Sequence, residues 1–108
     1  FKVDNLTAIV DRNRQQLDGW TSRVMELEPL AEKWRSFGWH TAEANGHDLS
    51  SLLAAIEEAK GVRGQPSAII AATIKGKGVS FMENNPDFHG KAPSAREVEQ
   101  ALEELGPP

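Results

Sequence analysis

The strongest constraint on the fold is an uncharged apolar run in the second half of the chain, Ser67-Ala68-Ile69-Ile70-Ala71-Ala72-Thr73-Ile74. Pro66 precedes this run and Gly76 closely follows it, and both residue types interrupt regular structure. A run without alternating polar residues is typical of a strand that is buried on both faces of a parallel sheet. We therefore expect residues 67–74 to form a buried strand.

Two more segments have the pattern of strands. Residues 6–10 form a short apolar run that ends at Asp11, which predicts another strand buried on both faces of a parallel sheet. After it, residues 12–27 are mixed in character, and we expect a long functional loop there. Residues 39–44 predict a further strand with a weaker pattern, which ends in a turn at Asn45-Gly46.

Three helices are predicted from their start and stop signals. The first begins at Glu28-Pro29 and is stopped by Gly38. The second is capped by Asp48, and the third begins at a capping box formed by Ser94 and Glu97. Each helix carries an apolar stripe suited to face a core. The stripes are Leu30, Trp34 and Phe37 in the first helix, Leu49, Leu52, Leu53 and Ile56 in the second, and Val98, Ala101, Leu102 and Leu105 in the third.

The alternation of these segments predicts an α/β fold, a parallel sheet with helices packed on it and right-handed crossovers. About three strands are present, and a sheet of this size leaves strand edges unpaired, so we expect the sheet to be incomplete. Phe1 stands only a few positions before the first predicted strand. We therefore expect an N-terminal portion of a larger protein to precede this chain.

Composition excludes several classes of partner. Twelve Lys plus Arg against sixteen Asp plus Glu give a net charge of −4, and no basic tract is present, so we expect no nucleic-acid partner. The absence of cysteine excludes disulfides and thiolate metal sites and favours a cytoplasmic setting. No apolar stretch approaches the roughly 20 residues of a membrane span, so we expect a soluble protein with no membrane association.

Ligands of an open parallel sheet bind beyond the carboxyl ends of its strands. In this chain the polar clusters at those ends are residues 11–19, 45–48 and 75–90. The loop over residues 76–93 is long enough to indicate a function. These segments are the ones in which we expect a binding site.

Two of these clusters have side chains suited to a metal and an anion. The side-chain oxygen of Asn13 and the main-chain oxygen of Gln15 are the type of ligand that Mg²⁺ prefers. The alternative is that Asn13 only satisfies the backbone of its own turn. Lys75-Gly76-Lys77-Gly78 could approach an anion closely through its main chain, or could be a solvated flexible loop.

The segment from Asp11 to Gly19, together with Lys75-Gly76-Lys77-Gly78 and His89-Gly90, resembles the diphosphate-binding part of enzymes of the transketolase family. The run from Lys75 to Pro93 is especially similar to the N-terminal subunit of split transketolases. The resemblance implies a thiamine diphosphate-binding fold. Residues 1–108 would be the C-terminal part of that domain, with residues 76–93 as an active-site loop.

The resemblance also implies the cofactors, thiamine diphosphate and Mg²⁺, and a role for each residue of the site. Asn13 would bind both the metal and the diphosphate, and Gln15 would bind the metal through its main-chain oxygen. Leu17 would lie near the thiazolium ring. Lys75 would contact the cofactor, and His89 would contact both the cofactor and the sugar substrate as a catalytic residue.

The implied reaction is the transfer of a two-carbon ketol unit from a ketose phosphate to an aldose phosphate. The Gly-Asp-Gly half of the family signature, with its metal-binding aspartate, is absent from this chain. The resemblance places that half in the remaining N-terminal part of the domain, and an activating glutamate in a pyrimidine-binding subunit or domain. We therefore expect a dimer or higher oligomer, and an isolated chain that is inactive.

Two other functions remain open at this point. One is a related thiamine enzyme, such as a 1-deoxy-D-xylulose-5-phosphate synthase, and the other is a non-catalytic assembly fragment of the same fold. His40 and His47 are interpreted as structural residues outside the site. Trp34, Phe37 and Trp39 are core candidates, and Trp20 is an interface candidate.

Overall fold

The computed structural model describes residues 2–17 and 19–107 of the chain. It divides into two compact units. The first consists of Phe1–Arg12 and Leu27–Thr73, and the second of Asn13–Glu26 and Ile74–Pro108. None of the helices within the described ranges is long and apolar enough to cross a membrane.

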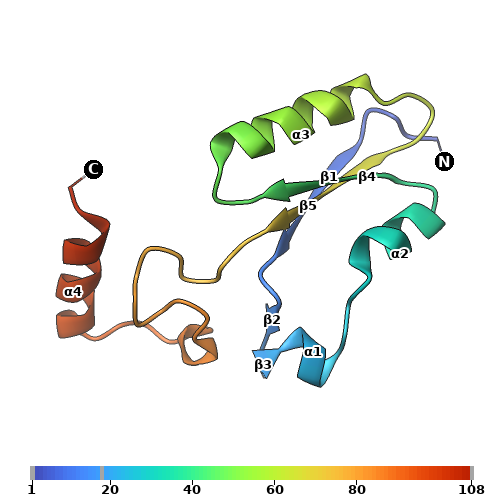
Figure 1. Ribbon diagram of the computed structural model, residues 1–108. Helices are drawn as coiled ribbons and strands as arrows, with labels where there is room; N and C mark the ends of the chain where they lie inside the picture. The colour runs from blue at the N-terminus through green and yellow to red at the C-terminus, as the bar shows by residue number, and fades with distance from the viewer. Residues whose placement is uncertain (1, 18, 108) are drawn as a thin grey trace. The chain divides into compact units, whose positions relative to one another are not determined.

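The first unit is built on a parallel sheet of three strands, β1 (Thr7–Arg12), β4 (His40–Asn45) and β5 (Ser67–Ala72). The strands lie in the order β1-β5-β4, so β5 is central (Figure 1). Ile69 of β5 is opposite Ile9 of β1 and Ala42 of β4. The predicted α/β class and the three strands are confirmed.

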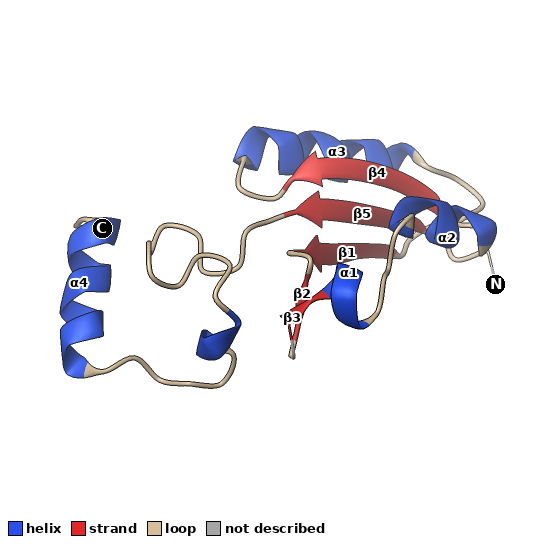
Figure 2. Cartoon of the chain, turned by 60° about the horizontal axis from the view of Figure 1, so that its bottom comes forward, coloured by secondary structure: helices blue, strands red, loops and turns tan. Residues whose placement is uncertain are grey.

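Two helices cover opposite faces of this sheet: α2 (Leu30–Ser36) and α3 (Leu49–Gly61) (Figure 2). Successive strand residues point to opposite faces, so Ile69 and Ile70 mark the two sides. Ile69 packs in the core beneath α3, whereas Ile70 lies on the side of α2. Both isoleucines are buried, which confirms the buried strand that the apolar run predicts.

Small residues let α3 approach the sheet closely. The core beneath α3 consists of Ala42, Ala44, Ala55, Ala59 and Ile69, with Leu52 and Ile56 packed against it. Asp48 caps α3 by accepting a hydrogen bond from the Ser50 N–H, as predicted. The predicted stripe is wrong for Leu49 and Leu53, which are 77% and 60% exposed, because alanines make the contact in their place.

Strand β1 is less buried than its sequence predicts. Its residues alternate between exposed and half-buried, and Ile9 is 56% exposed. The strand lies at the edge of the sheet, and α3 packs over β4 and β5. The expectation of burial on both faces is therefore wrong for β1.

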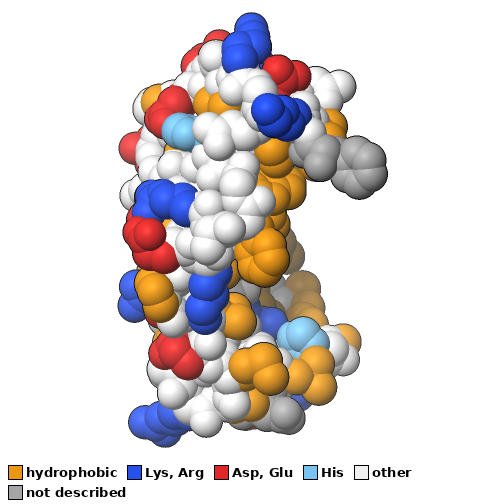
Figure 3. Space-filling view, turned by 90° about the vertical axis from the view of Figure 1, so that its right-hand side faces the viewer, with side chains coloured by type: hydrophobic (Ala, Val, Ile, Leu, Met, Phe, Trp, Pro, Cys, Tyr) orange, Lys and Arg blue, Asp and Glu red, His pale blue; other side chains and the backbone are white. Residues whose placement is uncertain are grey.

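The aromatic residues around α2 also differ from the prediction. Trp34 and Trp39 are half-buried and pack edge to face, with ring centroids 4.7 Å apart. Phe37 is 84% exposed, because it lies beyond the last turn of α2, at the position that caps the helix. Phe37 is thus not a core residue. More generally, Figure 3 shows apolar side chains on the surface of the molecule.

The segment predicted as a loop over residues 12–27 contains regular structure. Strands β2 (Gln15–Gln16) and β3 (Gly19–Trp20) pair antiparallel, and the short helix α1 (Thr21–Val24) follows. Residue 18, which stands between the two strands in the sequence, lies outside the described residues. This hairpin belongs to the second unit.

The rest of the second unit is a loop, the short 3₁₀ helix η1 (Pro86–Phe88) and the helix α4 (Ala95–Leu105). The predicted capping box at Ser94 and Glu97 is present. The stripe on α4 is largely exposed within the described part of the chain: Val98 is 41% exposed and Leu102 63%.

A carboxylate connects the loop to α4. Glu104 accepts hydrogen bonds from the Ser80 N–H and, at 2.7 Å, from the Ser80 hydroxyl. The pKa of Glu104 is lowered from its ordinary value, first because the Ser80 N–H donates to the charged form, then through Gln100. Folding lowers this pKa, so the charged carboxylate stabilises the folded unit at neutral pH, and this contribution is lost as the pH falls through the lowered pKa.

The Ile69→Ala substitution should lower the free energy of unfolding by about 2–5 kcal/mol, because it leaves a cavity in a fully buried position. Ile9→Ala is the matched control, since Ile9 is opposite Ile69 in the sheet but more than half exposed. It should change stability by only about 0.5 kcal/mol. Urea denaturation measures both values, and equal losses would contradict the described packing.

The Glu104→Gln substitution should destabilise the protein at neutral pH, because the amide oxygen is a weaker acceptor for the two Ser80 donors. The difference from wild type should shrink as the pH falls below 4.5, the ordinary pKa of the carboxyl, because protonation removes the same charge. Urea denaturation at a series of pH values tests this. Glu103→Gln on the same helix is the control, and an equal pH dependence in both variants would contradict the assignment.

Candidate functional site

The three parallel strands end at the same edge of the sheet. Ala72 of β5 is opposite both Arg12 of β1 and Asn45 of β4. The Thr73 N–H donates to the Arg12 carbonyl at 3.3 Å, so the pairing of β1 and β5 continues to the end of both strands. The first and last predicted strands therefore run side by side in the same direction.

Asn13 directly follows β1 and forms a tight turn. Its side-chain oxygen accepts a hydrogen bond from the Gln15 N–H at 2.9 Å, and Arg14 between them has a positive φ of 61°. The Thr21 N–H donates to the Arg14 carbonyl at 2.9 Å and continues the pairing of β2 with β3. The turn alternative for Asn13 is therefore present, and a carboxamide oxygen still has a second lone pair for another partner.

The glutamines of β2 contain polar atoms that the described residues leave unsatisfied. Both side-chain polar atoms of Gln15 and the Nε2 of Gln16 are buried without a hydrogen-bond partner in that part of the chain. Buried polar groups are nearly always paired in folded proteins, so unpaired ones indicate a missing ligand, water or segment. These atoms lie within three residues of Asn13 in the sequence.

Lys75 and His89 meet across the loop that follows β5. The Lys75 Nζ lies 3.1 Å from the His89 Nδ1. An ammonium group can only donate, so Nδ1 must accept, and a neutral His89 then carries its proton on Nε2. His89 is exposed, and Nε2 is therefore a hydrogen-bond donor that faces outward from the pair.

Backbone contacts hold this loop in a fixed shape. The Asn84 N–H donates to the Lys75 carbonyl at 2.9 Å and closes the base of the loop. Gly76 has a φ of +73°, and a Cβ on it would lie 2.5 Å from the Met82 carbonyl oxygen. Only glycine fits at this position, because the loop packs closely against its own backbone there.

The structure brings the predicted site residues together as two pairs, Asn13 with Gln15 and Lys75 with His89, and both pairs belong to the second unit. Leu17 lies in the connection between β2 and β3 and is 68% exposed. It offers an apolar surface, and none of these contacts includes it.

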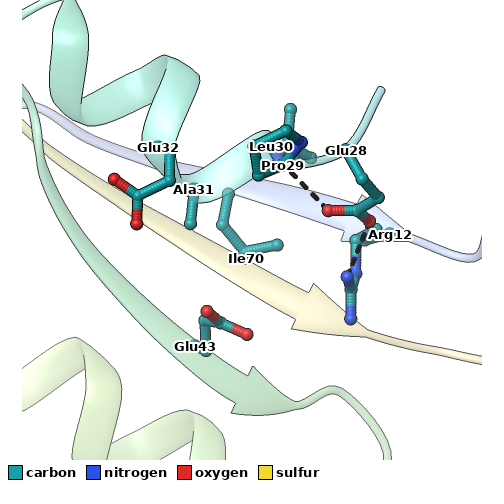
Figure 4. A pocket seen from close by; sticks show the side chains of 8 residues that line it. All are labelled: Arg12, Glu28, Pro29, Leu30, Ala31, Glu32, Glu43 and Ile70. Carbon is teal, nitrogen blue, oxygen red and sulfur yellow. Dashed lines mark hydrogen bonds and ion pairs between the residues drawn. The ribbon is translucent and has the colours of Figure 1, made fainter. Parts of the chain in front are cut away.

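Arg12 directly precedes Asn13 in the sequence, but its side chain has a partner within the first unit. Its guanidinium forms an ion pair with Glu28 at 2.7 Å, and Glu28 also accepts from the Leu30 N–H at 3.0 Å (Figure 4). These residues line a small pocket of about 120 Å³ with Glu43 and Ile70. Arg12 therefore fixes the start of α2, and sequence reasoning had no signal for this pairing.

The donor set fits part of a site for thiamine diphosphate and Mg²⁺. Asn13 and Gln15 offer neutral oxygens, and Lys75 offers a cation for phosphate. The unpaired atoms of Gln15 and Gln16, close to Asn13 in the sequence, need polar partners. No group of three or more His, Asp or Glu residues within the described ranges could hold a metal. A Mg²⁺ site completed by a carboxylate from the absent Gly-Asp-Gly half is what the family resemblance implies.

Comparison with known families decides the relationship. Residues 1–107 match the family described as transketolase, thiamine diphosphate binding domain. The chain belongs to the transketolase family. The family resemblance predicted from the sequence is confirmed, and so is the association of this domain with thiamine diphosphate.

Relatives within the transketolase family include proteins named as transketolase subunits and proteins named as transketolases. The chain is 43% identical to an apulose-4-phosphate transketolase subunit of Actinobacillus succinogenes, covering 97% of this chain and 38% of that protein. It is 41% identical to a 6-deoxy-6-sulfo-D-fructose transketolase subunit of Clostridium sp., covering 96% and 38%. It is 34% identical to human transketolase, covering 97% and 16%. The chain thus spans well under half the length of these relatives.

Solved transketolase structures share the fold. The transketolase of Pichia stipitis in complex with sedoheptulose-7-phosphate superimposes with a TM-score of 0.86 at 29% identity, over 96% of this chain and 15% of that one. The transketolase of Campylobacter jejuni gives the same TM-score at 28% identity, over 96% and 16%. These likenesses confirm the parallel sheet with packed helices as part of a transketolase fold.

The Gly76→Ala substitution should open the loop that carries Lys75, because the added methyl group would overlap the Met82 carbonyl. Gly64→Ala is the matched control, since Gly64 has nearly the same φ of +74° but open space around it. Both variants carry the backbone strain of about 1–2 kcal/mol, and only Gly76→Ala adds the overlap.

Hydrogen exchange of the Asn84 amide measures the outcome, because this amide closes the base of the loop. Exchange should accelerate at least tenfold in Gly76→Ala, which corresponds to about 1.4 kcal/mol of local opening, and should stay near the wild-type rate in Gly64→Ala. Equal protection of Asn84 in the two variants would contradict the described loop.

Proposed function

We propose that this chain is part of a transketolase that moves a two-carbon ketol unit from a ketose phosphate to an aldose phosphate, with thiamine diphosphate and Mg²⁺ as cofactors. The observation that carries the proposal is the Lys75–His89 contact in a chain of this family. The loop that bears this pair and the Asn13 turn follow two adjacent parallel strands.

In this proposal Asn13 and Gln15 bind Mg²⁺, the first through its side-chain oxygen and the second through its main-chain oxygen. Asn13 and Lys75 bind the diphosphate, Lys75 as a cation beside a polyanion. The exposed side chain of Leu17 supplies an apolar surface for the thiazolium ring. Thiamine diphosphate, when bound, supplies the nucleophilic carbon and accepts the electron pair released by carbon–carbon cleavage.

His89 is the proposed catalytic residue. With Lys75 donating to Nδ1, the proton on Nε2 is available to a substrate oxygen or to the diphosphate. A donor held in place in this way orients the sugar and moves a proton to or from its oxygen during the reaction. Lys75 therefore has two proposed roles, as a phosphate ligand and as the group that fixes the His89 tautomer.

The proposed site needs partners. A carboxylate for Mg²⁺ and a glutamate for the aminopyrimidine are assigned to the remaining part of the domain and to a pyrimidine-binding subunit or domain. Two relatives are named as transketolase subunits, which supports an assembly of separate chains. We propose a dimer or higher oligomer, and an isolated chain without activity.

For the sugar substrate we propose only its class, a ketose phosphate as donor and an aldose phosphate as acceptor. The relatives at 41% and 43% identity are named for a sulfo-deoxyfructose and for apulose 4-phosphate, whereas human transketolase is 34% identical. A test panel should therefore include both unusual sugars beside sedoheptulose 7-phosphate. Turnover of pyruvate with a triose phosphate in place of a ketose phosphate would favour the deoxyxylulose-phosphate synthase alternative.

In the assembled enzyme, His89→Ala should lower kcat by about 100-fold, the usual contribution of a positioned acid or base. Asn13→Ala should raise the Mg²⁺ concentration required for half-maximal activity, because it removes a metal ligand. His40→Gln is the control, since His40 pairs with Glu58 at 2.8 Å in the first unit and is not part of the proposed site.

Steady-state assays across Mg²⁺ and sugar concentrations separate these effects. The His40→Gln variant should keep activity near that of the wild type. An assembled enzyme in which His89→Ala retains full kcat would refute the catalytic role. If the wild-type assembly neither binds thiamine diphosphate nor transfers a ketol unit, the non-catalytic assembly alternative holds.

A further inference from the structure

The side chain of Thr73 connects the ends of all three parallel strands. Its hydroxyl donates a hydrogen bond to the Oδ1 of Asp11, at the end of β1. Its methyl group lies against Gly46, the first residue after β4, where a Cβ would come within 2.3 Å of the Thr73 Cγ2. Thr73 itself is the first residue after β5. The side chain of Thr73 thus contacts the carboxyl ends of both strands that neighbour β5.

Gly46 is needed for this close approach rather than for an unusual backbone conformation. It is absent from the glycines with positive φ, so an alanine could adopt its backbone angles. A Cβ would also lie 3.0 Å from the Ala72 carbonyl oxygen, which accepts a hydrogen bond from the Gly46 N–H at 2.8 Å. The turn after β4 is therefore packed directly onto the end of β5.

The position of these contacts in the sequence links them to the site. Asp11 stands two residues before Asn13, and Thr73 stands two residues before Lys75. The main-chain pairing of the two strands ends with the Thr73 N–H and the Arg12 carbonyl. The Thr73–Asp11 bond ties the side chains together at this same point, where the two segments leave the sheet.

The Thr73–Asp11 hydrogen bond is better placed to fix the spacing of the two segments than to stabilise the fold. Asp11 is exposed and Thr73 is half-buried, and the ladder between β1 and β5 already secures six residue pairs. Hydrogen bonds at exposed positions add little to overall stability. Binding groups, by contrast, lose much of their effect when they are displaced by a fraction of an ångström to one ångström.

We propose that Thr73 is a positioning residue, which holds the starts of the two cofactor-binding segments at a fixed spacing so that Asn13 and Lys75 reach the same diphosphate. Asp11 is its polar partner and Gly46 its packing partner. This inference rests on the proposed function of the site. In the proposed function, Asp11, Gly46 and Thr73 do not themselves contact the metal, the cofactor or the substrate.

The test is a calorimetric titration of the assembled enzyme with thiamine diphosphate at saturating Mg²⁺, which measures the Kd of the cofactor. Thr73→Val keeps the methyl contact and deletes the hydroxyl, and should raise the Kd about five- to tenfold, which is the order of one ordinary intramolecular hydrogen bond. Thr73→Ser keeps the hydroxyl and should bind nearly as tightly as the wild type. Thr7→Val on β1 is the matched control, because Thr7 is exposed and far along the strand from Asp11.

Asp11 and Gly46 give independent checks. Asp11→Ala should weaken cofactor binding as Thr73→Val does, whereas Asp11→Asn retains an acceptor oxygen and should restore most of the affinity. Gly46→Ala should weaken binding by pushing on the Thr73 methyl group. The double variant Gly46→Ala with Thr73→Ser removes that methyl group and should recover part of the loss.

Two readouts separate positioning from a general loss of structure. The thermal midpoint of the cofactor-free assembly should be the same for Thr73→Val and Thr7→Val. The KM for the ketose phosphate, measured at saturating cofactor, should stay within about twofold of wild type, because the effect is confined to cofactor binding.

The possible failures are distinguishable. If the wild-type assembly binds no thiamine diphosphate, the proposed function fails and the positioning role fails with it. If the wild type binds and Thr73→Val binds equally tightly, only the positioning role is overturned. It is also overturned if Thr73→Val lowers the thermal midpoint in proportion to its loss of affinity, or if Asp11→Asn and Thr73→Ser fail to restore binding.

Discussion

The parallel pairing of β1 with β5 is the constraint on which the rest of the structure depends. It joins residues about sixty positions apart in one register, from Thr7 opposite Ser67 to Arg12 opposite Ala72. Because parallel strands end at the same edge, this register alone makes the segments after Arg12 and Thr73 start next to each other. A slip of one residue would turn Asp11 to the other face and remove its bond to Thr73.

Local signals in the sequence predicted the elements well and the burial less well. Asp48 and the Ser94–Glu97 box are capping patterns whose chemistry lies within a few residues, and both were found. Burial of Ile9 and Leu53 depends on which other elements cover them, and periodicity carries no such information. The alanines beneath α3 show the same limit, since a small side chain signals close packing only once its neighbours are known.

The sequence predicted where the candidate site lies, because its polar residues stand directly after the predicted strands. Residue types alone left Asn13 open between a turn and a ligand, and the structure shows the turn. The Lys75–His89 contact spans a loop, so only the family resemblance brought the two residues together before the structure did. Thr73 carried no sequence signal, because its hydroxyl acts through a residue from another strand.

The outer edge of β1 has a consequence for handling the protein. In the described part of the chain, β1 pairs only with β5, so its other side presents unpaired N–H and C=O groups beside the exposed side chain of Ile9. Such an edge is a template for any extended peptide that meets it. In a concentrated solution of the separate chain, the nearest peptide of this kind is the β1 edge of a second copy.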